Sequence, residues 1–307
     1  MLSTKFIILA ALTFLLSFLI TPKTISLCHA LGALDIPDGK RKINTHPTPR
    51  LGGLAFFAAF FIFALPIAAY DKFTAAILSG GAILAIGGFA DDVFNMPPYL
   101  KLISQAAAAA VTISIIGTPE SFSFFGLFTI SLHGAIGAVI VIFKMLFTIN
   151  AVNFSDGLDG LAAGLSAVAF ISLFVYGTEN GNSATALSAL LLFSAVLGFL
   201  PYNKYHAKTF MGDVGSQFLG FAIAVLSLGC AENNAYTIET TLFLSIPALD
   251  TALSVLRRLA KGKSPFAADK GHLHHILLKR GISHPDAVKA LVLSNAAIAF
   301  ITIVLIK

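Results

Sequence analysis

The sequence predicts an all-α polytopic membrane protein with about ten transmembrane helices. Of its 307 residues, 57% are hydrophobic and 11% are charged, whereas a soluble domain carries about 25% charged residues. The apolar residues gather in runs long enough to cross a bilayer. The charged residues gather between these runs. We therefore expect one membrane-embedded domain that covers residues 1–307.

The apolar runs give the approximate bounds of the spanning helices: 4–22, 51–70, 74–90, 100–117, 132–150, 158–177, 184–200, 214–230, 236–256 and 286–306. The first run follows a single basic residue, Lys5, and no convincing small-residue cleavage site follows it. We therefore expect a first span rather than a signal peptide. Residues 118–131 contain four Phe and are expected to form an interfacial hairpin or a re-entrant piece.

Basic residues mark one side of the membrane. Segment 23–50 holds five Lys and Arg, segment 201–213 holds two, and segment 257–285 holds seven. The segments between them carry acidic residues and one basic exception, namely Glu120, Glu179, Glu232 and Lys72. The positive-inside rule then places the basic segments in the cytoplasm and both termini outside. Cys28 and Cys230 fall on opposite sides in this topology, so no disulfide is expected.

The segment Asn150–Gly164 carries the densest polar cluster, between two apolar runs. Two Asn and two Asp occur at three-residue intervals: Asn150, Asn153, Asp156 and Asp159. A continuous helix would rotate these side chains apart, because each step of three falls about 60° short of a turn. Gly157 and Gly160 are expected to break the helix and let them converge. A loop with one Asp as helix cap is the alternative. A polar break at membrane depth, however, is costly unless it lines a wet cavity or site.

Two further clusters precede this segment. Arg50, in the sequence Pro-Arg-Leu-Gly-Gly, is placed for a phosphate or acts as an interfacial anchor. Asp91 and Asp92 end the third run, where two carboxylates repel each other and meet a negative helix terminus. A divalent cation or a basic partner is expected there, and one of the pair could serve as a base. Lys101 is a second phosphate candidate.

Two more clusters follow it. Asp213 begins the eighth run as a candidate metal ligand or a plain helix cap, and Phe210 could stack on a base or lie at the interface. The segment 269–281 carries three His, namely His272, His274 and His275, and they suggest phosphate contacts. Their spacing does not match a tetrahedral zinc site. Lys144, inside the fifth run, needs a buried partner that the sequence does not assign.

All five clusters fall on the predicted cytoplasmic side, with acidic residues ringed by basic ones. This pattern suits a divalent metal that holds a phosphorylated substrate. A cation-coupled transporter would instead spread its carboxylates at mid-membrane. An intramembrane aromatic prenyltransferase would carry more closely repeated Asp and would use no nucleotide.

The ordered motifs resemble the polyprenyl-phosphate N-acetylhexosamine-1-phosphate transferases. They are Pro-Arg-Leu-Gly-Gly, the Asp pair, Asn-x-x-Asn-x-x-Asp-Gly-x-Asp-Gly, Phe-Met-Gly-Asp-x-Gly-Ser and His-Leu-His-His, over residues 46–281. The resemblance implies transfer of a sugar-1-phosphate from a UDP-sugar to a polyprenyl phosphate, with release of UMP. It also implies a bacterial inner membrane location and a requirement for Mg²⁺, with Mn²⁺ as a substitute. No nucleic-acid partner is implied, and a homodimer is left open.

The resemblance and the residue chemistry together give three groups of candidate residues. The catalytic carboxylates are Asp91, Asp92, Asp156 and Asp159. The metal ligands are Asp213, Asn153 and Asp156. The substrate-binding side chains are Arg50, Lys101, Asn150, Phe210, His272, His274 and His275, with Phe210 matching the aromatic that stacks on uracil. Direct attack by the lipid phosphate and a two-step route through a phosphoryl-enzyme both remain open.

The His motif indicates the branch of the family. His-Leu-His-His-Ile is closer to the branch that uses UDP-GlcNAc or related sugars and starts O-antigen, enterobacterial common antigen or teichoic acid synthesis. The alternative is phospho-MurNAc-pentapeptide translocase of peptidoglycan synthesis. That enzyme typically carries three consecutive His followed by an acidic residue.

Overall fold

The computed structural model describes residues 4–37, 46–125, 127–132, 134–230, 235–262, 264 and 271–306. Several of the charged residues used for the predicted topology lie outside this part, namely Lys40, Arg41, Lys42, Glu232, Lys263 and Lys270. The helices are α1 (Thr4–Leu31), α2 (Gly53–Ala68), α3 (Lys72–Phe94), α4 (Pro98–Ile116), α5 (Ala135–Ser155), α6 (Leu161–Glu179), α7 (Ser183–Asn203), α8 (Gly212–Gly229), α9 (Glu239–Leu242), α10 (Ser245–Ala260), α11 (Leu273–Lys279) and α12 (His284–Leu305). The strands are β1 (Leu34–Asp35), β2 (Thr48–Pro49), β3 (Ser121–Phe124), β4 (Phe128–Ser131) and β5 (Ala235–Thr237).

The predicted class, an all-α polytopic membrane protein, is confirmed. Within the described residues, eight helices are long and apolar enough to cross a membrane: α1, α3 to α8 and α12. The apolar helix α2 has 16 residues. The predicted ninth span, 236–256, is instead divided among β5, α9 and α10. Helix α10 carries Asp250 and ends in Arg257 and Arg258, so it is more polar than the other long helices.

Helix α8 is the centre of the bundle, with 89% of its most apolar window buried. Small residues let its neighbours approach closely, as is common between membrane helices. A Cβ on Gly53 of α2 would lie 2.4 Å from the backbone nitrogen of Gly215. A Cβ on Gly88 of α3 would lie 2.5 Å from the backbone nitrogen of Val214. These contacts bring the ends of α2 and α3 onto the first turn of α8.

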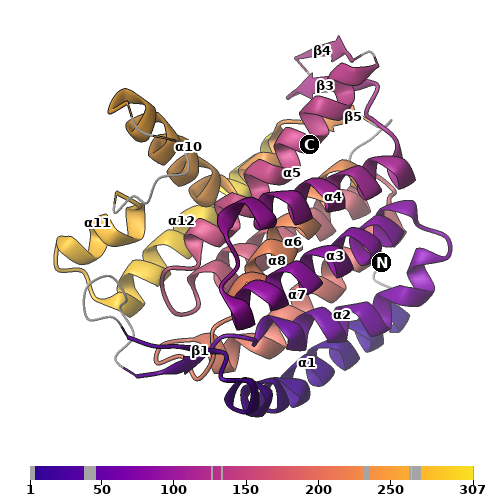
Figure 1. Ribbon diagram of the computed structural model, residues 1–307. Coiled ribbons are helices and arrows are strands. Elements are labelled where there is room, and N and C mark those ends of the chain that lie inside the picture. The colour runs from indigo at the N-terminus through magenta and orange to yellow at the C-terminus, as the bar shows by residue number, and fades with distance from the viewer. Residues whose placement is uncertain are drawn as a thin grey trace.

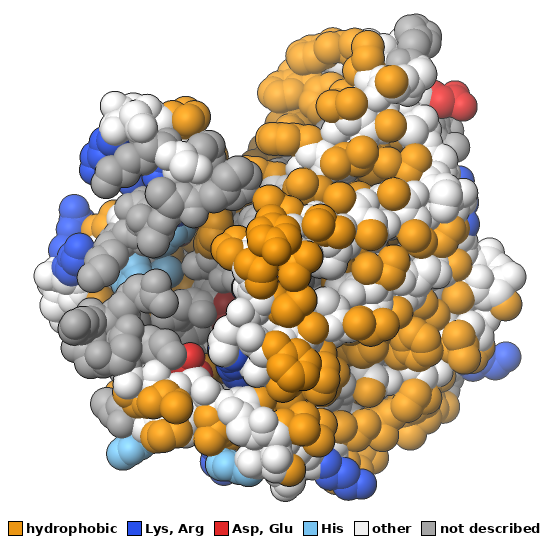
Figure 2. Space-filling view, in the orientation of Figure 1, with side chains coloured by type: hydrophobic (Ala, Val, Ile, Leu, Met, Phe, Trp, Pro, Cys, Tyr) orange, Lys and Arg blue, Asp and Glu red, His pale blue; other side chains and the backbone are white. Residues whose placement is uncertain are grey.

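The two ends of the bundle differ. The β1–β2 hairpin, the end of α3, the break between α5 and α6, and α11 lie at one end, and both chain termini lie at the other (Figure 1). Of the two forms predicted for residues 118–131, a hairpin or a re-entrant piece, the hairpin is present there as antiparallel β3 and β4, with β5 parallel to β3. Cys28 and Cys230 are both buried free thiols. Side chains on the face that includes α3, α4 and α5 are mostly hydrophobic, and a hollow with charged walls separates this face from α10 and α11 (Figure 2).

Lys144 has its partners on α9. Its ammonium group donates to the hydroxyl of Thr240 at 3.3 Å, and the buried carboxylate of Glu239 attracts its charge. Lys144 lies on α5, and both partners lie on the part of the chain that replaces the predicted ninth span. It therefore holds α9 against α5, away from the polar clusters.

Candidate active site

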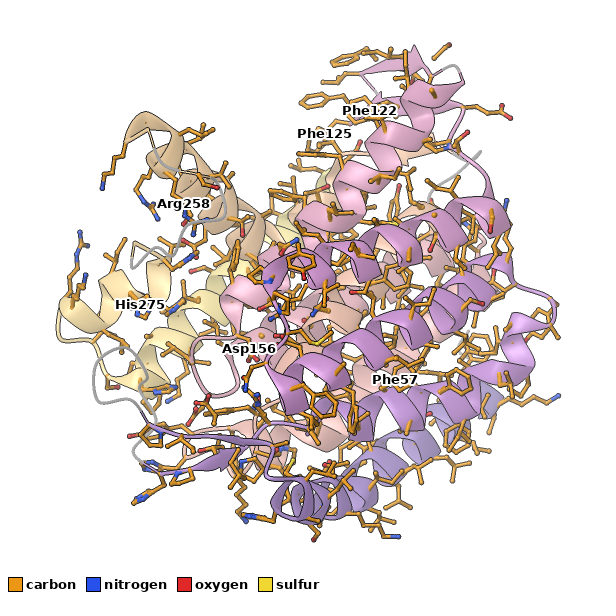
Figure 3. The ribbon with its side chains drawn as sticks, viewed as in Figure 1. Phe57, Phe122, Phe125, Asp156, Arg258 and His275 are labelled. Atoms are coloured by element: carbon orange, nitrogen blue, oxygen red, sulfur yellow. The ribbon has the colours of Figure 1, made fainter. Side chains whose placement is uncertain are left out.

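One cavity of about 570 Å³ collects the predicted polar residues at the end of the bundle. Twelve of the thirteen candidate residues line it: Arg50, Asp91, Asp92, Lys101, Asn153, Asp156, Asp159, Phe210, Asp213, His272, His274 and His275. The exception is Asn150. Figure 3 places Asp156 in the loop after α5 and His275 on α11, on two walls of the hollow.

The acidic centre of the cavity joins α3 to α8. Asp91 and Asp92 lie in the last turn of α3, and Asp213 lies in the first turn of α8. Each offers a carboxylate oxygen, and these oxygens lie within 4.8 Å of one another. The close packing of Gly88 against Val214 produces this approach. Three carboxylates at this separation repel one another unless cations or N–H donors balance them.

Asp92 is held by the backbone of α8. One carboxylate oxygen accepts from the N–H of Asp213 and the other from the N–H of Val214, each at 3.2 Å. Asp92 thus caps the N-terminus of α8 from a neighbouring helix, where negative charge is favourable. Arg50 completes the junction, since its Nε donates to the carbonyl oxygen of Asp92 at 2.8 Å and its Nη2 donates to Asn95 at 2.8 Å.

Asp91 is held by a cation instead. The ammonium nitrogen of Lys101, at the start of α4, lies 2.8 Å from Asp91 and 2.5 Å from Asp213. Lys101 therefore bridges the carboxylates of two helices. The carboxylate of Asp92 is therefore held by backbone N–H groups, whereas the carboxylate of Asp91 is paired with the ammonium group of a side chain.

A chain of buried amides stands behind Asp213. Gln217, one turn along α8, donates to Asp213 at 3.0 Å, and Asn153 donates to it at 3.5 Å. Gln105 donates to Gln217 at 3.3 Å, and Asn150 donates to Gln105 at 3.1 Å. Asn150 therefore reaches the site through two glutamines that the sequence analysis did not single out. The signal was their spacing, because Gln105 and Gln217 follow Lys101 and Asp213 by four residues and share their helix faces.

The helix break at the central motif forms as predicted. Helix α5 ends at Ser155 and α6 begins at Leu161, with Gly160 at φ 78°. The side chain of Asp159 accepts from the N–H of Ala207 at 3.0 Å, and its own N–H donates to His284 at 2.9 Å. Burial, together with the charges of Asp213 and Asp159, raises the pKa of Asp156 to about 7.

The three predicted His lie together on and before α11. The rings of His272 and His274 are parallel, with centroids 5.8 Å apart, and His275 lies 4.3 Å from His274. Burial and the two neighbouring His lower the pKa of His274 to about 4, so this ring is neutral at pH 7. A Cβ on Gly157 would lie 2.5 Å from His274 Nε2, which shows how closely α11 approaches the central motif.

Phe210 lies two residues before the start of α8, and its backbone is held by hydrogen bonds. Its N–H donates to the carbonyl of Pro49 at 2.7 Å, and its carbonyl accepts from Gly52 at 3.0 Å. Its side chain lines the cavity, where an aromatic face is available to a flat ligand.

The donor set fits a hard divalent cation. Mg²⁺ prefers carboxylate and carbonyl oxygens, and Asp91, Asp92 and Asp213 supply oxygens within reach of one ion. The amide nitrogen of Asn153 donates to Asp213 at 3.5 Å, so the amide group of Asn153 lies beside them. Asp156 lies outside the three-carboxylate group but lines the same cavity. Asp91 and Asp92 are buried, and Asp213 is partly buried.

Fold and site together define a membrane-embedded helical bundle with a polar, acidic cavity at one end. A model of the family described as Glycosyl transferase family 4 matches residues 74–231. The chain therefore belongs to glycosyl transferase family 4, and the resemblance drawn from the motifs is confirmed, including the branch.

Named relatives agree with this assignment. The chain is 34% identical over 304 residues to the decaprenyl-phosphate N-acetylglucosaminephosphotransferase of Mycolicibacterium smegmatis, covering 88% of this chain and 74% of the relative. It is 32% identical to the probable undecaprenyl-phosphate N-acetylglucosaminyl 1-phosphate transferase of Bacillus subtilis, covering 97% and 85%. It is 28% identical to the undecaprenyl-phosphate alpha-N-acetylglucosaminyl 1-phosphate transferase of Yersinia pestis, covering 95% and 81%.

Proposed function

We propose that the protein transfers GlcNAc-1-phosphate from UDP-GlcNAc to undecaprenyl phosphate and releases UMP. This is the initiating step of a cell-envelope glycan. The observation that carries the proposal is the acidic centre of Asp91, Asp92 and Asp213, bridged by Lys101 inside a membrane bundle. The names of the relatives supply the sugar and the lipid. The cavity faces the cytoplasm of a bacterial inner membrane in this proposal.

The proposed metal is Mg²⁺, with Mn²⁺ as a substitute. Asp213 would hold it, with oxygens from Asn153, Asp156 or the Asp91–Asp92 pair completing the set. When bound, the ion would neutralise charge on the pyrophosphate of the UDP-sugar. Lys101 would then leave its bridging position and become free to contact a phosphate.

Asp91 is the better base of the Asp pair. Both oxygens of Asp92 already accept N–H groups of α8, whereas Asp91 is held by the side chain of Lys101. Asp91 would accept the proton from the polyprenyl phosphate, whose oxygen attacks the sugar-bearing phosphorus. The P–O bond to UMP breaks in the same displacement. Arg50, Lys101 and the His cluster would hold the phosphate oxygens, and Phe210 would stack on uracil.

Release of UMP tests the proposal. Purified protein in detergent with undecaprenyl phosphate and Mg²⁺ should release UMP from UDP-GlcNAc, and omission of the lipid should abolish release. UDP-MurNAc-pentapeptide serves as a second donor in the same assay. Release from that donor alone would assign the protein to the peptidoglycan reaction and would refute the proposed sugar.

A further inference from the structure

Asp250 of α10 forms a buried pair with His272. One carboxylate oxygen lies 2.9 Å from His272 Nδ1, and the other accepts the backbone N–H of Leu273 at 3.0 Å. The side chains of Asp250 and His272 are each 8% exposed. Asp250 is not among the site residues predicted from the sequence, because it lies within a run predicted to cross the membrane.

This pairing bears on the tautomer of His272. A carboxylate that is ionised only accepts hydrogen bonds, so a hydrogen on Nδ1 would complete the pair with Asp250 and leave Nε2 on the opposite edge of the ring. His272 lines the cavity, while its Nδ1 is turned to α10. The ring is also flanked by Phe154, with centroids 5.6 Å apart, and by the parallel ring of His274.

Two more contacts hold the backbone that precedes His272. Arg257 of α10 donates to the carbonyl of Gly271 at 2.7 Å and to the hydroxyl of Ser254 at 2.7 Å. A Cβ on Gly271 would lie 2.7 Å from the guanidinium group of Arg257, so the backbone passes directly against it. One face of α10 therefore holds the residue before His272, the ring of His272 and the residue after it.

We propose that Asp250 is a positioning residue that fixes His272 as the Nδ1–H tautomer and presents its Nε2 to the phosphate-bearing substrate in the cavity. Asp250 acts through His272 and touches no substrate itself. The inference rests on the proposed function for its effect on turnover, whereas the tautomer of His272 is a property of the protein alone. Groups that orient a metal-ligating His typically contribute 10- to 100-fold to activity or affinity, and we expect an effect of this order for Asp250.

The tautomer can be measured directly. Full-length protein labelled with ¹⁵N-histidine is placed in lipid nanodiscs, and the His272 signal is assigned by its loss in His272→Gln. Long-range ¹H–¹⁵N correlation should show a protonated Nδ1 in the unaltered protein. It should show loss of that state in Asp250→Asn. An Nε2–H tautomer in the unaltered protein would overturn the inference whether or not any variant folds.

Kinetic measurements on variants supply the second test of the inference. Asp250→Asn should lower kcat/KM for UDP-GlcNAc about 10- to 100-fold, and Asp250→Asn combined with His272→Gln should be no worse than His272→Gln alone. Asp71→Asn is the matched control, because Asp71 is also a buried carboxylate that accepts from a backbone N–H, at 2.8 Å, at the other end of the bundle. Multiplying effects in the double variant would overturn the inference. An unaltered protein that releases no UMP would contradict the proposed function and leave the tautomer result standing.

Discussion

The ammonium nitrogen of Lys101 lies 2.5 Å from a carboxylate oxygen of Asp213. The same nitrogen lies 2.8 Å from Asp91, so one side chain neutralises carboxylates from two helices. A divalent cation bound to the acidic centre would compete with this ammonium group for the same oxygens. Metal binding and the position of Lys101 are therefore coupled.

Lys101→Gln should separate metal binding from turnover. Removal of the competing charge should tighten Mn²⁺ binding several-fold, because the two carboxylates lose their internal cation. The same change should lower kcat by about 100-fold or more, because a charged donor to the phosphates is lost. Mn²⁺ titration followed by electron paramagnetic resonance measures the first effect, and UMP release measures the second.

Lys289→Gln is the matched control, since Lys289 is an exposed lysine on α12 whose ion-pair distance to Asp286 is 3.9 Å. It should change neither quantity. Weaker Mn²⁺ binding in Lys101→Gln would show that Lys101 supports the metal instead of competing with it.

The two adjacent aspartates should fail in different ways. Asp92→Asn places an amide N–H against the N–H donors of α8 and should cost about 1–3 kcal/mol of stability. Asp91→Asn should abolish turnover while leaving the thermal unfolding temperature nearly unchanged. Thermal unfolding and UMP release on both variants check this division. Equal stability losses would contradict the capping role of Asp92.

Gln217 should tune the metal site. Gln217→Leu removes the N–H donor that lies 3.0 Å from Asp213 and leaves the partner amide of Gln105 without its acceptor. We expect roughly tenfold weaker Mn²⁺ binding, the effect typical of losing a group that orients a ligand. Ser227→Ala, buried on the same helix and away from the cavity, is the control and should bind Mn²⁺ normally. Unchanged affinity in Gln217→Leu would show that Asp213 does not depend on the amide chain.

The raised pKa of Asp156 predicts a pH-dependent stability. Its pKa is about 7 in the folded protein against an ordinary value of 3.8, so the folded state binds more protons between pH 4 and 7. Without divalent cations, stability should therefore fall as pH rises through this window, by at most about 4 kcal/mol. Asp156→Asn should flatten the dependence in melting curves recorded from pH 5 to 8. A steeper fall in the variant would refute the assignment.

The sequence predicted the helix break at the central motif for a sound physical reason. Gly160 adopts a left-handed backbone conformation at the break, Gly157 leaves room for His274, and Asn153, Asp156 and Asp159 do line one cavity. Asn150 did not follow, because it lies one helical turn before Asn153 within α5 and bonds to Gln105. The three-residue spacing identifies the group of polar side chains. It does not determine which of these side chains face the cavity.

Other features depend on contacts between distant segments. The capping of α8 by Asp92 joins residues 121 positions apart, and local signals allow Asp213 to be its own cap. The ninth predicted span divided into α9 and α10 because buried polar partners, Lys144 for Glu239 and His272 for Asp250, hold each piece. The mean hydropathy of a sequence window does not register such pairs, so hydropathy alone predicted one span.

Transfer of labelled sugar phosphate to lipid tests the central claim most directly. Purified protein is incubated with undecaprenyl phosphate and UDP-GlcNAc carrying ³²P on the phosphorus next to the sugar, with and without Mg²⁺. We predict Mg²⁺-dependent appearance of ³²P in the lipid fraction, lost in Asp213→Ala and kept in Lys289→Gln. Label that stays in the aqueous fraction with folded protein, Mg²⁺ and lipid all present would contradict the account.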